Sequence, residues 1–411
     1  MSLQSTSSTS TIYRAPWVVP ISSAILRDGA VVVDDKRILA VGLYSDIAGR
    51  FQAVPVKTCS GVLLPALVNA HIHLELSVYG IVHPPSKHST MCDWIKELLK
   101  TRETSKASID EIVDAAQKTA QDQYESGVGL MLDIGNIDLG KFNFCPAEIH
   151  SLREMLGPSE SATKAAIETI VKIPLEQSVT GHAPYSTSPK LLQYIKNRCR
   201  NNDQLFSLHL AENVDEGLLL EKGEGCFAKF LKERGGSDSP FPIPGIDSSA
   251  VVGYLQQLDI MDSKTLCVHC VHLNDEEIKI LADTNVHVCL CPGSNKFLSV
   301  GKVRLQALID QDILPAIGTD SIASNPELDM WQEMALLRKE HPDVAADRIL
   351  SMATIAGAIS MGRHTTYGSL EEGKTARFIH IEGAEYANAA NAEQLLECLT
   401  TAGRPDSVSR L

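Results

Sequence analysis

The chain has 411 residues, of which 44% are hydrophobic and 21% are charged, and its formal net charge is −14. This length accommodates a large α/β barrel with a satellite domain, and the composition is typical of soluble globular proteins. The negative charge excludes nucleic acid and anionic membranes as expected partners, because both would repel the chain.

The N-terminal segment and the cysteines predict a cytoplasmic protein. Residues 1–11 are rich in Ser and Thr, which predicts a disordered tail, and they lack the basic start and apolar centre of a signal peptide. No stretch approaches the roughly 20 apolar residues of a membrane span. The ten scattered cysteines are expected to be reduced thiols, because disulfides are rare in the cytosol.

Both ends of the chain carry short β-like runs. Residues 12–62 alternate such runs with turns, and the acidic pair 34–35 between the apolar runs 30–33 and 38–41 predicts a hairpin. Near the other end, a Gly-containing turn is followed by a short apolar strand. We therefore predict one small β module built from two pieces of chain, 12–62 and 366–411.

Between these pieces, residues 63–365 alternate strand-like and helix-like segments. Eight strands are expected, at 63–70, 128–133, 149–156, 178–183, 205–210, 265–271, 286–290 and 313–317. Alternating strands and helices predict parallel pairing, and eight such repeats indicate a (β/α)₈ barrel.

Helix signals and one long insert complete the barrel segment. Ser108 and Glu111 have the spacing of a capping box, which predicts a helix from 109 to about 126. Further helices are expected at 275–283 and 303–310. The insert 223–249 is rich in Gly, Pro and Ser and longer than an ordinary connection, so we expect it to form a lid or a wall of the pocket.

Histidines end three of the predicted strands. His71 and His73 close the first strand, and residues i and i+2 of a strand project to one face. His209 and His269 end the fifth and sixth strands, and Asp320 follows the eighth. Because the C-terminal ends of parallel barrel strands meet at one face, we expect these side chains to converge. Imidazoles with one carboxylate suit a single catalytic divalent metal.

The residues around this cluster predict hydrolytic chemistry. A metal of this kind lowers the pKa of a bound water to near 7. Glu212, three residues after His209, is placed to act as a general acid and base. Asp320 is expected to bind the metal or take a proton, and His269 to hold or polarise the attacked group. Each residue alone has a structural explanation, but their joint placement at strand ends favours a metal site.

At this point the motifs resemble those of the amidohydrolase superfamily. Pro65-Ala-Leu-Val-Asn-Ala-His71-Ile-His73, His209-Leu-Ala-Glu212, His269-Cys270 and Gly318-Thr-Asp320-Ser are similar to its motifs on strands one, five, six and eight. Gly181-His182-Ala-Pro-Tyr185 and Cys291-Pro-Gly-Ser294-Asn295 resemble further motifs of the branch with cytosine, guanine and S-adenosylhomocysteine deaminases and triazine chlorohydrolases. The similarity extends over nearly the whole chain.

The resemblance implies a fold and a site. The expected fold is a distorted (β/α)₈ TIM barrel over 63–365, with a β-sandwich domain formed by 12–62 plus 366–411. One divalent metal, Zn²⁺ favoured over Fe²⁺, is expected, and proteins of this branch are often homodimers. The implied metal ligands are His71, His73, His209 and Asp320, and the implied catalytic residues are Glu212, His269 and Asp320.

The substrate-binding residues implied by the resemblance are His182, Trp94 and Asn295. Trp94 resembles a pocket residue of deaminases acting on adenine nucleosides, although packing on the barrel explains it equally well. Cys92 stands where those deaminases tend to place an acid for the ribose hydroxyls. Strand four lacks the bridging Lys of binuclear relatives, which favours one metal, while Glu154 on strand three is a residual bridging candidate.

We therefore predict a metal-dependent deaminase that hydrolyses an aminated heterocycle or nucleoside and releases ammonia. The small-molecule substrate is attacked at an amidine-type ring carbon by water activated at the metal. One alternative is a chlorohydrolase or N-dealkylating hydrolase of a triazine-like ring. Some of those enzymes have a neutral residue in place of Glu212, so its presence favours deamination. The other alternative, a non-catalytic barrel scaffold, conflicts with retention of the metal ligands.

Overall fold

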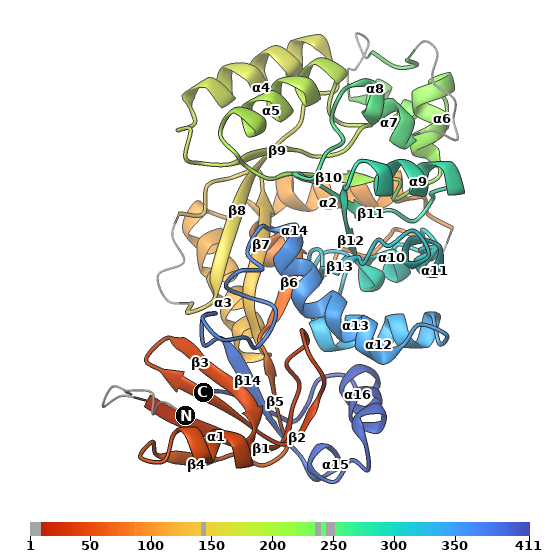
Figure 1. Cartoon of the computed structure of the whole chain (residues 1–411). Helices are drawn as coiled ribbons and strands as arrows, with labels where there is room; N and C mark the ends of the chain where they lie inside the picture. Colours follow the sequence, from red (N-terminus) through yellow and green to blue (C-terminus); the bar gives the residue numbers. More distant parts are fainter. Residues whose placement is uncertain (1–9, 87, 141–144, 235–239, 244–250) are drawn as a thin grey trace.

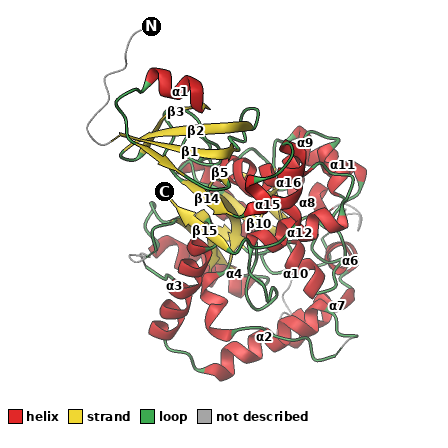
Figure 2. Cartoon of the chain, turned by 90° about the horizontal axis from the view of Figure 1, so that it is seen from below, coloured by secondary structure: helices red, strands yellow, loops and turns green. Residues whose placement is uncertain are grey.

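The computed structural model describes residues 10–411 apart from 87, 141–144, 235–239 and 244–250. It contains a distorted α/β barrel beside a smaller β domain (Figure 1). Seen from below, helices surround the barrel, and the strands β1–β3 of the small domain lie to one side (Figure 2). Among the residues described, none of the helices has the length and apolarity needed to cross a membrane.

The small domain is built on a seven-stranded sheet that combines both chain ends. Its strands are β1 (Ser10–Val18), β2 (Leu26–Asp34), β3 (Arg37–Leu43), β4 (Val56–Thr58), β5 (Val62–Pro65), β14 (Phe378–Glu382) and β15 (Ser407–Arg410). β14 pairs antiparallel with β5, which joins the two ends directly. Ser10 and Thr11 already belong to β1, contrary to the predicted tail, and the rest of that tail lies outside the described residues.

The first apolar run is two strands, not the single strand predicted over 63–70. β5 belongs to the small sheet, whereas β6 (Leu67–Ile72) is the first barrel strand. Ala66 lies between them, and its N–H donates to the carbonyl oxygen of Arg377. Both strands are buried throughout, so their residues form one uninterrupted apolar run in the sequence.

The barrel strands form two four-stranded parallel sheets. One contains β6, β7 (Val128–Gly135), β8 (Glu148–Met155) and β9 (Val179–Gly181), and the other contains β10 (Phe206–Leu210), β11 (Thr265–His269), β12 (His287–Leu290) and β13 (Ala316–Ile317). A parallel bridge between Ile72 and Asp320 connects β6 to the end of β13. On the other side, the N–H of His209 donates to the carbonyl of His182 at 2.8 Å. These two contacts close the barrel.

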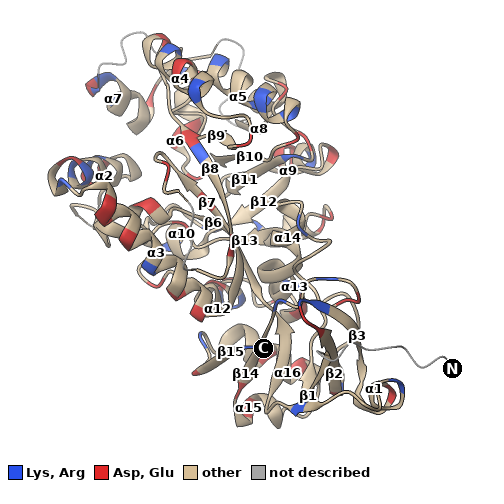
Figure 3. Ribbon diagram, turned by 90° about the vertical axis from the view of Figure 1, so that its left-hand side faces the viewer, with Lys and Arg blue, Asp and Glu red and all other residues tan. Residues whose placement is uncertain are grey.

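Helices cover the barrel and extend the small domain. They are α1 (Tyr44–Arg50), α2 (Met91–Ser105), α3 (Ile109–Glu125), α4 (Glu160–Lys172), α5 (Pro189–Asn201), α6 (Asp215–Lys222), α7 (Gly225–Glu233), α8 (Val251–Gln257), α9 (Asp275–Asp283), α10 (Pro292–Phe297), α11 (Leu305–Ile309), α12 (Met330–Glu340), α13 (Ala346–Ser351), α14 (Gly357–Ser360), α15 (Ala384–Ala387) and α16 (Ala392–Thr401), with a 3₁₀-helix at Leu74–Tyr79 and a π-helix at Met352–Ala356. Charges of both signs lie on the outer helices α3 and α4 (Figure 3).

The local helix signals predicted the helix starts well. Ser108 and Glu111 form the expected capping box, with the Ser108 N–H donating to Glu111 at 2.8 Å, and α3 runs to Glu125. The predicted helix 275–283 is α9, whereas the one expected at 303–310 is confined to α11. Polar caps define helix starts through local hydrogen bonds, which explains why they can be read from sequence.

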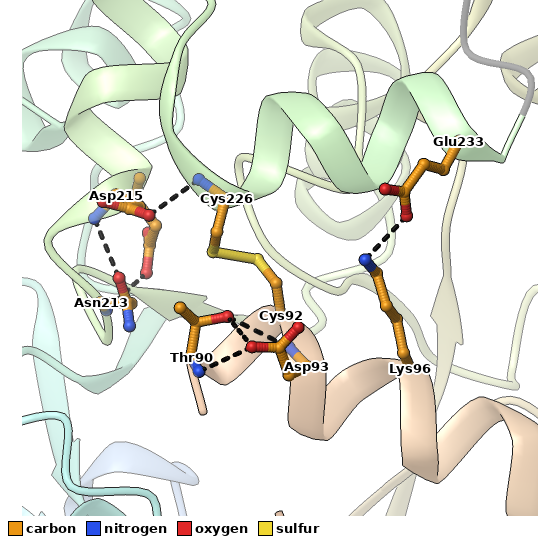
Figure 4. The surroundings of a disulfide bond; sticks show 9 residues. Thr90, Cys92, Asp93, Lys96, Asn213, Asp215, Cys226 and Glu233 are labelled. Carbon is orange, nitrogen blue, oxygen red and sulfur yellow. Dashed lines mark hydrogen bonds and ion pairs between the residues drawn. A yellow bond between two sulfur atoms is a disulfide. The ribbon is translucent and has the colours of Figure 1, made fainter. Parts of the chain in front are cut away.

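The cysteines are not all reduced thiols, contrary to the sequence-based expectation. Cys92 in the first turn of α2 and Cys226 in the first turn of α7 form a disulfide (Figure 4). A second cross-link between the same helices is the ion pair of Lys96 with Glu233, 2.7 Å apart. The two cysteines of the disulfide lie 134 residues apart in the sequence. The positions of cysteines alone do not reveal which of them are paired. The other cysteines of the described region are free.

Replacing Cys226 by Ser is expected to lower the free energy of unfolding by roughly 2–5 kcal/mol, because the disulfide constrains the unfolded chain. Urea unfolding under non-reducing conditions measures the change. Cys398→Ser is the matched control, since that thiol is free and equally half-buried. Equal stability of the two variants, together with two alkylatable thiols at Cys92 and Cys226 in the native protein, would contradict the cross-link.

Candidate active site

Four side chains predicted as metal ligands converge at the C-terminal ends of the barrel strands. His71 lies in β6 and His73 directly follows it, His209 lies in β10, and Asp320 follows β13. All four are buried, and their ligand atoms lie within 4.8 Å of one another. His73 Nε2 is 3.3 Å from His209 Nε2, and Asp320 Oδ1 is 3.5 Å from His73 Nε2 and 3.7 Å from His71 Nε2.

Backbone carbonyls fix the tautomers of two of these histidines. His73 Nδ1 donates to the carbonyl oxygen of Ile134 at 2.9 Å, and His209 Nδ1 donates to that of His182 at 2.8 Å. A carbonyl oxygen only accepts, so each Nδ1 carries a proton, and in the neutral ring each Nε2 presents a lone pair. Burial also lowers the pKa of His209 to about 4, with the nearby His269 and His73 adding to the effect.

The pocket between these atoms fits a divalent cation. In the neutral rings the two Nε2 lone pairs, 3.3 Å apart, repel each other, and a cation bound between them would remove this repulsion. Two imidazoles bound tetrahedrally to Zn²⁺ at about 2.0–2.1 Å lie about 3.3–3.4 Å apart, which matches this separation. The Nε2 atom of His71 is also buried without a hydrogen-bond partner. The donor set, imidazole nitrogen with one carboxylate, suits Zn²⁺ or Fe²⁺.

Two serines orient the carboxylate of Asp320. Ser294 and Ser324 donate to its Oδ2 atom at 2.6 and 2.9 Å, so Oδ1 remains directed at the histidines. Asp320 has φ +59° and His269 has φ +73°, in the left-handed region. Residues other than glycine avoid this backbone conformation unless the surrounding structure holds them in it, and residues held in this way cluster at active sites.

Glu212 and His269 face each other beside the metal pocket. Glu212 Oε1 is 3.6 Å from His269 Nε2, and His269 Nδ1 donates to Asn295 Oδ1 at 2.9 Å. The turn that carries Glu212 is held by Glu216, which accepts from the backbone N–H groups of residues 211, 212 and 213. Burial, reinforced by the charge of Asp320, raises the pKa of Glu212 well above its usual value. A raised pKa suits a carboxyl group that accepts and returns a proton.

A cavity of about 160 Å³ opens onto these groups. Its inner end is lined by His73, His209, Glu212, His269 and Asp320, and its walls are largely apolar. Apolar walls exclude water and accept a flat ring, while a few polar groups set its orientation. A larger hollow between α10 and α12 contains none of the predicted site residues.

The three residues predicted to bind substrate have different positions. Trp94 of α2 and His182 both line the cavity, and the Trp94 indole N–H donates to the carbonyl of Val82 at 2.8 Å. Asn295 lies behind His269 and is not among the lining residues, so the geometry favours a positioning role over substrate contact. Phe230 of α7 also lines the cavity, so the described part of the 223–249 insert contributes to its wall.

Several lining residues were not identified from the sequence. Glu75, Arg102 and Asn136 form a polar group at the cavity edge, in which Arg102 contacts Glu75 at 3.4 Å and Asn136 at 3.1 Å. These residues come from a 3₁₀-helix, α2 and the loop after β7. These three residues share no motif or fixed spacing. Asn136 could have been noticed from the sequence, because it is a polar residue shortly after the end of a predicted strand.

Comparison with known proteins identifies the family. Residues 62–402 match the Amidohydrolase family, so the chain belongs to it. A 5-methylthioadenosine/S-adenosylhomocysteine deaminase of Moorella thermoacetica is 28% identical over 396 residues, covering 89% of this chain and 84% of the relative. Family and relative together indicate a hydrolase that acts on carbon–nitrogen bonds.

Solved structures support the same fold. The aminofutalosine deaminase of Helicobacter pylori, in complex with methylthio-coformycin, superposes with a TM-score of 0.81 at 22% identity, covering 97% of this chain and 98% of that one. An adenosine deaminase from Xanthomonas campestris with bound zinc gives a TM-score of 0.72 at 23% identity, covering 97% and 91%. At these identities the likeness establishes the barrel architecture.

Replacing His209 by Ala is expected to abolish stoichiometric metal binding, because the remaining ligands lose a nitrogen whose lone pair is directed by the backbone. Metal content per chain is measured after loading with Zn²⁺ and desalting. Zn²⁺ at a thousandfold its dissociation constant is also expected to stabilise the wild type by about 4 kcal/mol, and the variant not at all.

The control is His272→Ala, which removes a nearby histidine whose Nε2 donates to the carbonyl of Val300 and which lies outside the cluster. Equal Zn²⁺ content in both variants would show that His209 is not a ligand.

Proposed function

We propose that this protein is a mononuclear metal-dependent deaminase that hydrolyses an aminated heterocycle, with adenosine-type nucleosides as the first substrates to test. The observation that carries the proposal is the convergence of the four ligand atoms beside Glu212 and His269 at the end of a buried cavity. The names of the deaminase relative and of the two solved structures support this substrate class.

His71, His73, His209 and Asp320 would hold one divalent ion, with Zn²⁺ favoured. When bound, the ion would supply Lewis acidity that activates a water molecule for attack on the ring carbon. Asn295 keeps the Nδ1 proton of His269 engaged, so His269 Nε2 remains directed at the reaction space. Ser294 and Ser324 keep the carboxylate of Asp320 in place during the reaction.

Glu212 would move the protons of the reaction. Its carboxylate takes a proton from the attacking water and delivers it to the substrate, so that the amino group leaves as ammonia. One C–O bond forms and one C–N bond breaks, and the net change is addition of water and loss of ammonia. The burial that raises its pKa also keeps bulk water from competing as a proton donor.

The remaining cavity residues would bind the ring. Trp94 and His182 are the proposed substrate contacts, because both line the cavity and come from different elements. The alternative of a triazine chlorohydrolase uses the same barrel, but a buried carboxyl group at Glu212 favours ammonia as the leaving group. A small-molecule substrate, a cytoplasmic location and a homodimer remain predictions from the sequence, and the disulfide removes one argument for the cytoplasm.

Replacing Glu212 by Gln is expected to lower kcat for ammonia release by roughly 10²- to 10⁴-fold, because the amide cannot transfer the proton. The assay uses Zn²⁺-loaded enzyme with adenosine, 5′-methylthioadenosine, S-adenosylhomocysteine and cytosine. Zn²⁺ content is expected to stay at the wild-type level, since Glu212 is not one of the ligands.

Glu221→Gln provides the matched control, because Glu221 is on the adjacent helix α6 and outside the cavity. Undiminished turnover in Glu212→Gln would exclude the proton transfer proposed for it. Absence of ammonia release from every substrate by the metal-loaded wild type would argue against the proposed substrate class.

A further inference from the structure

Glu154, at the end of β8, is a buried carboxylate that the proposed mechanism does not use. Its side chain lines the cavity and is only 5% exposed. Asn136 donates to its Oε2 atom at 2.9 Å, whereas Oε1 is buried without a hydrogen-bond partner. A buried carboxylate oxygen without a hydrogen-bond partner is costly, because it has lost its hydrogen bonds to water and gained none in the protein.

A second metal ion does not explain this free oxygen. Ligand atoms of Glu154, His182 and His209 lie within 4.8 Å of one another. However, the His209 nitrogen on this side is Nδ1, 4.0 Å from Glu154 Oε1, and its proton is donated to the carbonyl of His182. A protonated ring nitrogen cannot bind a cation. Glu154 and His182 alone provide fewer ligands than the three or four of an ordinary protein metal site.

The other carboxylates that line the cavity have different surroundings. Glu75 Oε2 accepts from the backbone N–H groups of Asn136 and Ile137 at 2.8 and 2.9 Å, and its Oε1 faces Arg102. Asp320 is held by two serines, and Glu212 faces His269. Among the described lining residues, Glu154 is the carboxylate with a buried oxygen that has no hydrogen-bond partner, and this oxygen can accept from a ligand.

We propose that Glu154 determines substrate specificity by accepting a hydrogen bond at Oε1 from a hydroxyl or N–H group of the substrate. This proposal rests on the proposed function, since it concerns the same cavity. An ionised carboxylate is only an acceptor, so it favours a ligand with a donor at this point and rejects an anionic group there. Sites built to bond a hydroxyl or N–H group discriminate strongly against analogues that lack it.

Two matched substrate pairs identify the donor. Adenosine and 2′,3′-dideoxyadenosine differ in the ribose hydroxyls, and cytosine and 1-methylcytosine differ in a ring N–H. In Zn²⁺-loaded wild type, kcat/KM is expected to favour the donor-bearing member of one pair by roughly tenfold to a hundredfold, as for hydrogen bonds to charged groups. Glu154→Met, of similar length but with only a weakly accepting thioether, is expected to bring that ratio close to one.

Two further variants separate recognition from structure. Glu154→Gln keeps a neutral acceptor and is expected to retain an intermediate ratio. Glu148→Met makes the same change at the opposite end of β8, where Glu148 contacts Arg363 and Tyr367, and is expected to keep the wild-type ratio. The proposal would be overturned if the wild type showed no preference in either pair. It would also be overturned if Glu154→Met lowered kcat/KM equally for both members of the preferred pair.

Failure of the proposed deaminase activity can be distinguished from failure of the proposed role of Glu154. If the wild type releases no ammonia, titration calorimetry measures dissociation constants instead. The ratio of these constants is compared for inosine and 2′,3′-dideoxyinosine, and for uracil and 1-methyluracil. Preference for the donor-bearing ligand that disappears in Glu154→Met would support Glu154 as the binding determinant even then. Equal affinities in the wild type, or an unchanged preference in Glu154→Met, would overturn it.

Discussion

The approach of His73 Nε2 to within 3.3 Å of His209 Nε2 is the interaction on which the site depends. In the neutral rings both nitrogens present lone pairs, because each Nδ1 donates its proton to a hydrogen bond with a backbone carbonyl. This arrangement of lone pairs is unfavourable by itself and would become favourable with a cation bound by these two nitrogens together with His71 and Asp320. Binding of such an ion would be coupled to the closed barrel, since the four side chains come from both of its four-stranded sheets.

The surrounding residues hold this arrangement in place. Serine hydroxyls orient the carboxylate of Asp320, Asn295 orients His269, and Glu216 ties the turn that presents Glu212. The apolar walls of the substrate cavity come from helices that are far apart in the sequence. Two of these helices, α2 and α7, are joined by the disulfide and by the Lys96–Glu233 ion pair (Figure 4). The chemistry and the substrate cavity thus rest on different parts of the fold, so one can vary while the other is kept.

Much of the site follows from the sequence. Histidines at the ends of apolar runs, an acid three residues after one of them and an aspartate after the last strand predicted a metal pocket, because parallel barrel strands deliver their ends to one face. The helix starts at Ser108 and before Asp275 were also predictable, since capping is a local hydrogen-bonding pattern. The break between β5 and β6 at Ala66 could not be predicted, because two buried strands in different sheets form one uninterrupted apolar run in the sequence.

The sequence by itself determined the barrel and the histidines and carboxylates at its strand ends, since these depend on periodicity and on the face that parallel strands share, and its family motifs indicated the reaction class. Only the tertiary structure decided which contacts are made across the molecule: the pairing of Cys92 with Cys226, the place of Asn295 behind His269, and the free oxygen of Glu154 in the cavity. The physical reason is that these features depend on side chains from elements that meet in space without any fixed spacing along the chain.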